Sequence, residues 1–505
     1  MKIFDFYIDD VAFACATGFL AGVAAANFAV SLIVVGFAAA MLGGVIVFLV
    51  PRRGLWKFAG VVFVCTVAGF CYFHVFENIA AVRTNIVFNK KISFSAVVAN
   101  EPKISASGKY LIVAADLCAP YAGSVTILAP ANSEVFYGDV ISMAAKIMPA
   151  DVAGDSPFVI PPAITVEAHD HGFWLMAALL DFKDAMVRSI NGSLSADAAG
   201  FLAAVAFSAK EFLTGDVAAA MMASGTSFLA TLYGMKISLL VFFVSNLLLG
   251  YVDRRIIFGI AVVVAFGFAL AAGAPVSAVR AAIMAVVALW ARETGGVLLR
   301  RNALAFTAVG LMLWNPALVT DIGFLASFGS VAGILYLSPA LWNAFHWTKK
   351  VILNWRENIV MNLAAQLAII PLVADAAGGF PLISLISGAV LIVFLPFTVF
   401  GGWATGLVGL LMRPAAFVIA PFMSAVAGIS ISLIRFFASF PFAVAIPWNA
   451  WTIPLYYGCL IVFAAIFSKK KSNDIFAAAV SQAEDFTDKE WMPAKVGDET
   501  ARMDD

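Results

Sequence analysis

The sequence predicts a polytopic α-helical membrane protein with about eleven transmembrane helices and a small inserted all-β domain of the OB type. The first observation is composition: 63% of the 505 residues are hydrophobic and 12% are charged. Soluble domains are instead about 45–50% apolar and about 25% charged. The second is a series of apolar runs, each long enough to cross a bilayer. The third is an interruption at residues 77–170, where short β-type runs replace the apolar ones.

Residues 1–76 are expected to form the N-terminal transmembrane helices. Residues 11–50 are almost unbroken apolar sequence, enough for two spans, and a third span is expected over residues 58–76. The loop before the third span holds Arg52, Arg53 and Lys57. Positive charge in a short loop marks the cytoplasmic side, so we expect a cytoplasmic N-terminus and a third span that exits to the outside.

Residues 77–170 are expected to fold as a small extracytoplasmic barrel of the OB type. Turn signals rich in Gly, Asp, Ser and Pro separate five β-type runs, at residues 91–99, 109–116, 124–130, 139–147 and 163–168. Five short strands suit such a barrel. OB barrels often bind single-stranded nucleic acid, and a structural or assembly role is the alternative.

The hydrophobic pattern divides the rest of the chain into three parts. Residues 171–235 are expected to hold an amphipathic interfacial helix over 172–191, with Lys183 on its polar side, and a second helical region over 197–223. Residues 236–468 form the main membrane core, whose arginine-rich loops should be cytoplasmic. Residues 469–505 are a polar cytoplasmic tail.

Charged residues inside apolar sequence mark a candidate site between residues 225 and 328. An intramembrane charge costs roughly 2.5–3.5 kcal/mol and usually pairs within the protein or faces a wet path. Lys236 either meets phosphate at a pore mouth or snorkels to the interface. Arg280 is suited to phosphate, with Asp321 as a partner. The set of path candidates is Gly225, Thr226, Gly234, Lys236, Ser277, Arg280, Asp321, Gly323, Phe324, Ser327 and Gln366.

Several kinds of site are not indicated by the sequence. The five cysteines lack ligand spacing, and the triplet from His169 to His171 has no further ligand nearby, so neither a metal nor a cofactor is expected. No Walker A, HExxH or GxSxG motif occurs. Asn362 and Gln366 are spaced for an amide pair on one helix, and interhelical hydrogen bonding is their favoured role.

The order of these segments resembles the ComEC family of competence proteins. The resemblance is carried by GTSFLATLYGMKIS, APVSAVRAAIM, RNALAFTAVGLMLWNP, DIGFLASFGSVAGIL and LAAQLAIIPL. Residues that match family positions are Gly225, Thr226, Leu229, Ala230, Gly234, Ser277, Arg280, Ala281, Met284, Asn302, Ala303, Leu304, Pro316, Gly323, Phe324, Ser327, Gln366 and Pro371. The chain departs from the pattern at Phe228 and Lys236, where histidines are usual, at Tyr233, where a serine is usual, and at Ser208, Ala209, Lys210 and Leu325.

The resemblance implies a channel for single-stranded DNA in the bacterial cytoplasmic (inner) membrane, with the barrel outside to receive the strand. The implied partners are single-stranded DNA, the lipid bilayer, a cytoplasmic motor or helicase, an extracytoplasmic DNA receptor and, in one arrangement, further copies of the chain. Many family members carry a C-terminal metallo-β-lactamase-like domain proposed to be a nuclease. This sequence has no ligand run of that type, so enzymatic activity is not expected. A transporter of another anionic solute and a non-transporting assembly protein remain alternatives.

Overall fold

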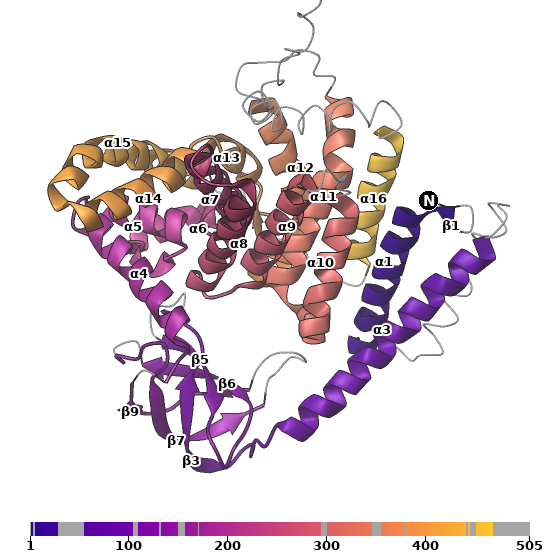
Figure 1. Cartoon of the computed structure of the whole chain (residues 1–505), viewed down its shortest axis with the longest axis horizontal. Coiled ribbons are helices and arrows are strands. Elements are labelled where there is room, and N and C mark those ends of the chain that lie inside the picture. Colours follow the sequence, from indigo (N-terminus) through magenta and orange to yellow (C-terminus); the bar gives the residue numbers. More distant parts are fainter. Residues whose placement is uncertain are drawn as a thin grey trace, which may run out of the picture. The chain divides into compact units, whose positions relative to one another are not determined.

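A computed structural model describes most of the chain, and its helices dominate (Figure 1). The described residues are 2–3, 6–28, 55–104, 110–130, 133–149, 157–169, 171–293, 300–345, 355–377, 379–440, 443–444 and 451–467. The chain divides into two compact units, the first of residues 1–328 and 381–443 and the second of residues 329–380 and 444–505. The predicted second span, most of the loop at residues 346–356 and the predicted tail lie outside the described residues.

The predicted number of about eleven spans is not confirmed by the helix lengths. Six helices within the described ranges are long and apolar enough to cross a membrane, or seven if one bent pair counts as a span. The six belong to α1 (Ile8–Asn27), α3 (Leu55–Arg83), α8 (Arg254–Ala271), α11 (Ile322–Ala344), α12 (Trp355–Ala377) and α15 (Arg413–Ala438). The bent pair is α13 (Ser384–Leu391) and α14 (Leu395–Leu411), which meet at 53°.

The difference arises from shorter apolar helices that the hydrophobic pattern suggested as full spans. They include α7 (Tyr233–Leu248), α9 (Val276–Glu293) and α16 (Thr452–Phe467). At about 1.5 Å per residue, a 16-residue helix is about 24 Å long, which is less than the roughly 30 Å hydrocarbon core. Apolar composition therefore shows membrane residence more reliably than it shows the number of complete crossings.

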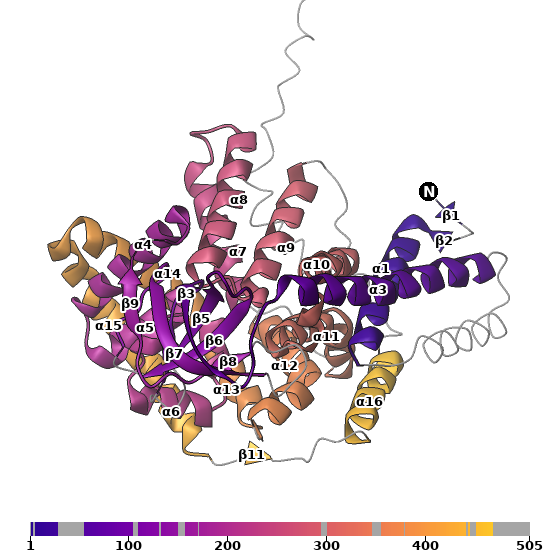
Figure 2. The same cartoon turned by 90° about the horizontal axis from the view of Figure 1, so that it is seen from below.

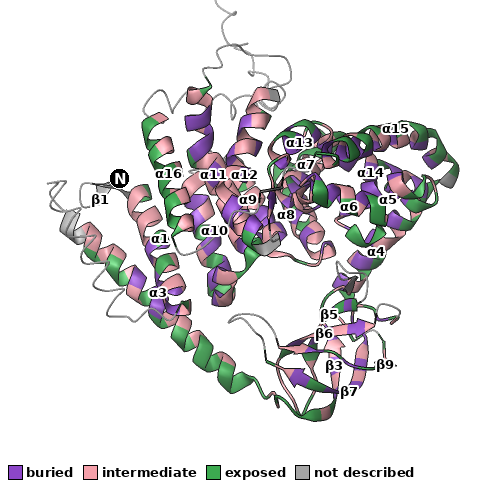
Figure 3. Ribbon diagram, turned by 180° about the vertical axis from the view of Figure 1, so that it is seen from behind, coloured by how far each residue is buried: buried purple, intermediate pink, exposed green. Residues whose placement is uncertain are grey.

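Glycines allow helices α1 and α3 to pack closely. Gly18 and Gly22 lie on α1, and a Cβ added to Gly18 would lie 3.0 Å from the Val62 carbonyl oxygen. The contacts advance in the same direction along both helices, which therefore run parallel. This is the small-residue packing typical of membrane helices. Much of the surface of α3 is exposed, as a lipid-facing helix requires (Figure 3).

The β domain is a closed, barrel-like sheet. Five strands match the predicted runs within two residues: β3 (Lys91–Val98), β5 (Tyr110–Leu117), β6 (Ser124–Pro130), β7 (Val140–Met148) and β9 (Thr165–Ala168). Two short strands were not predicted, β4 (Lys103–Ile104) and β8 (Phe158–Val159). The sheet closes because β3 pairs antiparallel with both β5 and β7. Alternate residues of each strand, such as Val113 and Ile127, fill the interior.

A buried ion pair ties the barrel to helix α4 (Trp174–Asn191). Lys183 is 5% exposed, and its Nζ donates to Oε1 of Glu101 at 2.5 Å. Gly138 has φ +84°, and a Cβ there would lie 2.7 Å from the backbone nitrogen of Gly172. The predicted position of Lys183 on the polar side of α4 is wrong, because the barrel supplies a carboxylate on the buried side.

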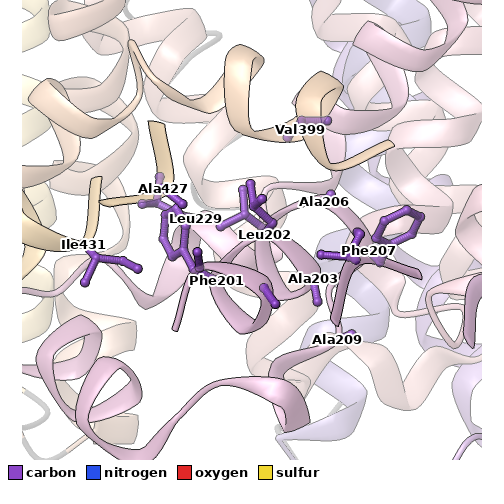
Figure 4. Packing of buried hydrophobic residues seen from close by; sticks show 14 of the residues in the cluster. Phe201, Leu202, Ala203, Ala206, Phe207, Ala209, Leu229, Val399, Ala427 and Ile431 are labelled. Carbon is purple, nitrogen blue, oxygen red and sulfur yellow. The ribbon is translucent and has the colours of Figure 1, made fainter. Parts of the chain in front are cut away.

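A hydrophobic cluster joins six described helices of the first unit (Figure 4). They are α4, α5 (Ala196–Phe207), α6 (Gly215–Ala223), α13, α14 and α15, and the cluster includes Leu202 of α5, Val399 of α14 and Ile431 of α15. The single helical region predicted over 197–223 is therefore two helices. A left-handed residue, Ser208, and the short 3-10 helix η1 (Lys210–Phe212) separate them.

Helices α7, α8 and α9 lie side by side in the first unit (Figures 1 and 2). Alanines at their contacts, such as Ala261 and Ala282, are fully buried. Helix α10 (Arg300–Trp314) packs on α1, where Arg301 forms an ion pair with Asp10 and Asn302 Nδ2 donates to the Asp9 carbonyl at 3.0 Å. The start of α11 packs in a hydrophobic cluster with α1, α9 and α10.

The second unit holds the later part of α11 together with α12 and α16. Leu337 and Leu341 pack against Val360 and Ala364. Tyr456 on α16 donates a hydrogen bond from its hydroxyl to the Leu367 carbonyl at 2.7 Å. The predicted final span thus forms a helix anchored to α12 through side-chain hydroxyls.

Candidate functional site

Arg280 is a buried guanidinium on α9 that faces the first half of α11. Its side chain is 8% exposed. Its Nε donates to Ser327 Oγ at 2.7 Å, and its Nη1 lies 3.4 Å from Met284 Sδ. Its charge also lies 5.6 Å from the centre of the Phe328 ring, within the range of a cation–π contact. None of these partners is an anion, so the guanidinium keeps capacity for a negatively charged ligand.

Asp321 does not pair with Arg280 in this structure. Asp321 is exposed at the start of α11, where its Oδ1 accepts a hydrogen bond from the Phe324 amide at 2.6 Å. This is the N-cap role that an aspartate fills well. The ion pair suggested by the sequence is absent from the described contacts, because the Asp321 carboxylate caps the exposed start of α11, whereas Arg280 is buried.

Phe324 and Phe328 form an aromatic pair beside the arginine. Their ring centres are 4.4 Å apart, and Phe324 is 4% exposed. Phe324 packs in the cluster that α1, α9, α10 and α11 share. Ser327 therefore supplies the hydroxyl and Phe328 the ring that contact Arg280, and Phe324 packs against Phe328 from behind.

Lys236 is fully buried and lies in a separate part of the first unit. Its Nζ is 2.8 Å from Ser208 Oγ and 2.8 Å from the Ala230 carbonyl oxygen. The charge site lies 5.4 Å from the Tyr233 ring centre. With 0% exposure, Lys236 does not touch an open path in this conformation. Both of the suggested positions, at a pore mouth and at the lipid interface, require more exposure than the structure shows.

Gly225 and Thr226 form a tight turn packed against α13. Gly225 has φ +67°, and a Cβ there would lie 2.5 Å from Ser384 Cβ. Thr226 is 0% exposed, and its hydroxyl pairs with that of Ser224 at 2.8 Å. Ser387 completes this contact by donating to the Ser224 carbonyl at 2.8 Å. The glycine is needed because few other residues adopt a positive φ without strain.

The remaining predicted residues are dispersed. Ser277 is half-buried in the first turn of α9, and Gly323 is exposed at the start of α11. Gly234 is half-buried, and a Cβ there would meet no atom within 4 Å. Gln366 belongs to the second unit, where its Nε2 donates to Asn362 Oδ1 at 3.2 Å. The amide pair expected from the i, i+4 spacing is therefore present.

Three contacts were not predicted from the sequence. Ser208 contacts Lys236, Phe328 contacts Arg280, and Glu101 contacts Lys183. Each joins segments separated by at least 28 residues. Only Phe328 could have been identified from the sequence, because it lies four residues after Phe324 and therefore on the same face of the helix.

No metal centre is indicated in the part of the chain that the structure describes. No group of three or more His, Cys, Asp or Glu side chains converges there. His169 instead places its Nδ1 2.7 Å from Oδ1 of the buried Asp139. One histidine of the predicted solvated triplet is thus tied to the barrel.

A family model matches this chain. The model of the family described as Competence protein matches residues 205–471, slightly more than half of the sequence. The match covers the Ser208, Lys236 and Arg280 regions of the first unit and most of the described second unit. No curated protein and no solved structure matches the chain.

Proposed function

The chain belongs to the Competence protein family, and we propose that it carries single-stranded DNA across the bacterial cytoplasmic membrane. Its described helices support a multi-pass membrane protein. The proposed role requires an outer surface that receives the strand, a polar contact within the membrane and an inner exit. A separate cytoplasmic motor and an extracytoplasmic receptor would act with it, since no nucleotide-hydrolysis motif was found.

Arg280 is the observation that carries this proposal. A guanidinium within apolar helices is expensive unless it serves a bound anion or a polar path. Arg280 is held by one hydroxyl, one thioether and one ring, and no carboxylate among the described residues neutralises it. The planar guanidinium matches the geometry of phosphate oxygens. A passing phosphodiester would supply the missing negative charge.

The packing of α4 on α8 supports an extracytoplasmic barrel. Helix α8 begins with Arg254 and Arg255, and Leu179 of α4 lies 4.0 Å from the Cβ position of Gly267 near the other end. The arginine end of a span favours the cytoplasm. The barrel precedes α4 and is tied to it by Lys183, so it is associated with the opposite end of α8.

Two lysines on the barrel surface support its role as a receiving surface. Lys91 on β3 and Lys146 on β7 are directly opposite each other in the antiparallel register, and both are exposed. Like charges in this position repel and destabilise a sheet. An anionic strand would relieve the repulsion, and the exposed Tyr110 offers a ring on which a base could stack.

The proposal is tested by measuring entry of labelled DNA into the cytoplasm of cells that express defined variants. Arg280→Ala should reduce entry by about tenfold or more, because one charge-assisted contact is worth about 1.5–3 kcal/mol. Arg280→Lys should retain part of the activity, since it keeps the charge but loses the bidentate geometry. Membrane abundance must be equal in all strains. Normal entry in a deletion strain would refute the proposal.

A second comparison addresses the departures from the family pattern. The double substitution Phe228→His and Lys236→His restores the usual histidines, and its DNA entry should be compared with that of the unmodified chain. Equal or higher entry would show that this segment tolerates either arrangement. Lys236→Met is the matched control, because it keeps the length of the side chain and removes the amine.

Transport of another anionic solute is the second candidate. The 53° bend between α13 and α14 favours it, because transporter sites are often built from discontinuous helices. This candidate predicts unchanged DNA entry in the deletion strain together with loss of uptake of a small anion. A scaffold role predicts that Arg280→Ala changes neither activity while the protein remains abundant.

A further inference from the structure

Ser208 has an unusual backbone conformation for a serine. It ends α5 with φ 64° and ψ 19°, in the left-handed region. Helices often end with a left-handed residue at this position, but glycine or asparagine is more usual there than serine. The chain neighbours Phe207 and Ala209 are buried in the hydrophobic cluster (Figure 4). Ser208 itself is half-buried, so its hydroxyl is closer to the surface than its neighbours are.

The partner of this hydroxyl is a lysine without a counter-ion. Lys236 Nζ lies 2.8 Å from Ser208 Oγ, and its other hydrogen-bond partner is the Ala230 carbonyl at 2.8 Å. No carboxylate within the described ranges forms an ion pair with it. An ammonium that is 0% exposed and lacks an anion is strongly disfavoured, whereas a neutral amine is tolerated.

The neutral amine explains the observed contacts. In the structure Lys236 Nζ donates to both the Ser208 hydroxyl oxygen and the Ala230 carbonyl. At the same 2.8 Å, rotation of the Ser208 hydroxyl lets the lone pair of a neutral amine accept its proton instead. The side chain of Tyr233 also hydrogen-bonds Ser208, which restrains the hydroxyl. A serine whose hydroxyl points at a desolvated lysine is the arrangement of a Ser–Lys catalytic pair.

We propose that Ser208 and Lys236 form a nucleophile–base pair that transfers an acyl group from a carboxylic ester with an apolar acyl chain. The apolar preference follows from the buried hydrophobic residues next to the pair in the chain, Phe207 beside Ser208 and Ile237 beside Lys236. Lys210, two residues after Ser208, is a positive charge on the same short segment. This activity is separate from DNA transport.

The chemical steps are balanced with an ester and water alone. Ser208 Oγ attacks the carbonyl carbon while Lys236 takes the hydroxyl proton, and the departing alkoxide takes that proton and leaves as an alcohol. The acyl group is now an ester of Ser208. Water then loses a proton to Lys236 as it attacks this ester. The carboxylic acid is released, and the proton returns to the Ser208 oxygen.

A biotinylated fluorophosphonate, which reacts with activated serine hydroxyls, tests the proposal on the full chain in membrane vesicles. The unmodified protein should be labelled, and mass spectrometry should locate the adduct on Ser208. Ser208→Ala should abolish labelling, and Lys236→Met and Lys236→Arg should each slow it by about a hundredfold or more, the lower end of the range for loss of a general base. Labelling should become faster as the pH rises, because the base acts in its neutral form.

Ser193→Ala is the matched control. Ser193 is another half-buried serine, and its hydroxyl donates to the Ser189 carbonyl at 2.9 Å. This variant should be labelled like the unmodified chain. The proposal is overturned if the unmodified chain stays unlabelled while a serine hydrolase added to the same vesicles reacts. An adduct on any other residue also overturns it, even where a substituted variant fails to fold.

Discussion

Buried lysines at the barrel junction and in the helical core have different surroundings. Lys183 on α4 is 5% exposed and is matched by Glu101, which the barrel supplies. Lys236 on α7 is 0% exposed and is matched only by a hydroxyl and a carbonyl. The first lysine serves the architecture, because its pair with Glu101 joins the barrel to α4. The second is suited to a neutral amine, and its proton can therefore take part in chemistry.

The largest expected effect on stability comes from removing the ion pair between the barrel and α4. Glu101→Gln removes the carboxylate that pairs directly with the buried Lys183, so the free energy of unfolding should fall by up to about 3–5 kcal/mol. Thermal unfolding in detergent provides the measurement. The double variant Glu101→Leu with Lys183→Met should recover most of the loss, since neither charge remains. A Glu101→Gln variant as stable as the original chain would show that the pair is not formed.

The next effect on stability differs between two glycines of the helical core. Gly225→Ala should lower stability by about 1–3 kcal/mol, because it forces an alanine into a positive φ and its Cβ toward Ser384. Gly234→Ala is the control. Gly234 lies in α7 with open space around it, so alanine should stabilise by about 0.5–1 kcal/mol. Opposite signs in the two melting temperatures are expected, and equal signs would contradict the packing described here.

A smaller effect tests the unpaired lysine directly. Lys236→Met should change the free energy of unfolding by no more than about 1 kcal/mol, because an apolar side chain replaces a buried amine that forms no ion pair with a described residue. The unmatched Ala230 carbonyl limits any gain. Lys183→Met should cost more, since it leaves Glu101 unpaired. If Lys236→Met were the more harmful of the two, the contrast between the two lysines would be wrong.

The smallest effect depends on pH and concerns Asp184 beside the junction. Burial raises the pKa of Asp184 above its usual 3.8. The stability that this carboxyl contributes is therefore complete below pH 3.8 and is lost as the pH rises through the raised value. Asp184→Asn should melt slightly higher than the original chain at neutral pH, and the difference should disappear toward pH 3.8.

Asp197 provides the control of opposite sign. Hydrogen bonds from Thr214 and Arg435 hold the pKa of Asp197 below its usual 3.8. Its contribution is present above pH 3.8 and is lost as the pH falls through the lowered value. Asp197→Asn should therefore lower the melting temperature at neutral pH, by a small amount because the ion pair is exposed. Equal signs for the two variants would contradict these surroundings.

Much of the fold could be predicted from the local sequence pattern. Five strands lie within two residues of their predicted positions, because alternation and turn residues act over only a few positions. The region 197–223 was harder, because the helix break is made by a left-handed serine, Ser208, and not by the glycine or proline that usually signals one. For the candidate site, the sequence pointed to Arg280 and Ser327 but suggested Asp321 as the partner.

The sequence alone determined membrane residence, the inserted β domain and the family resemblance, because composition, periodicity and motif order are properties of the chain itself. Tertiary structure decided which buried charges have partners. Glu101 reaches Lys183 across 82 residues, and Arg280 reaches Ser327 across 47. The cost of burying a charge depends on the atoms that packing brings within about 4 Å. No local pattern specifies those atoms, so the same residue type became a structural ion pair in one region and a candidate base in another.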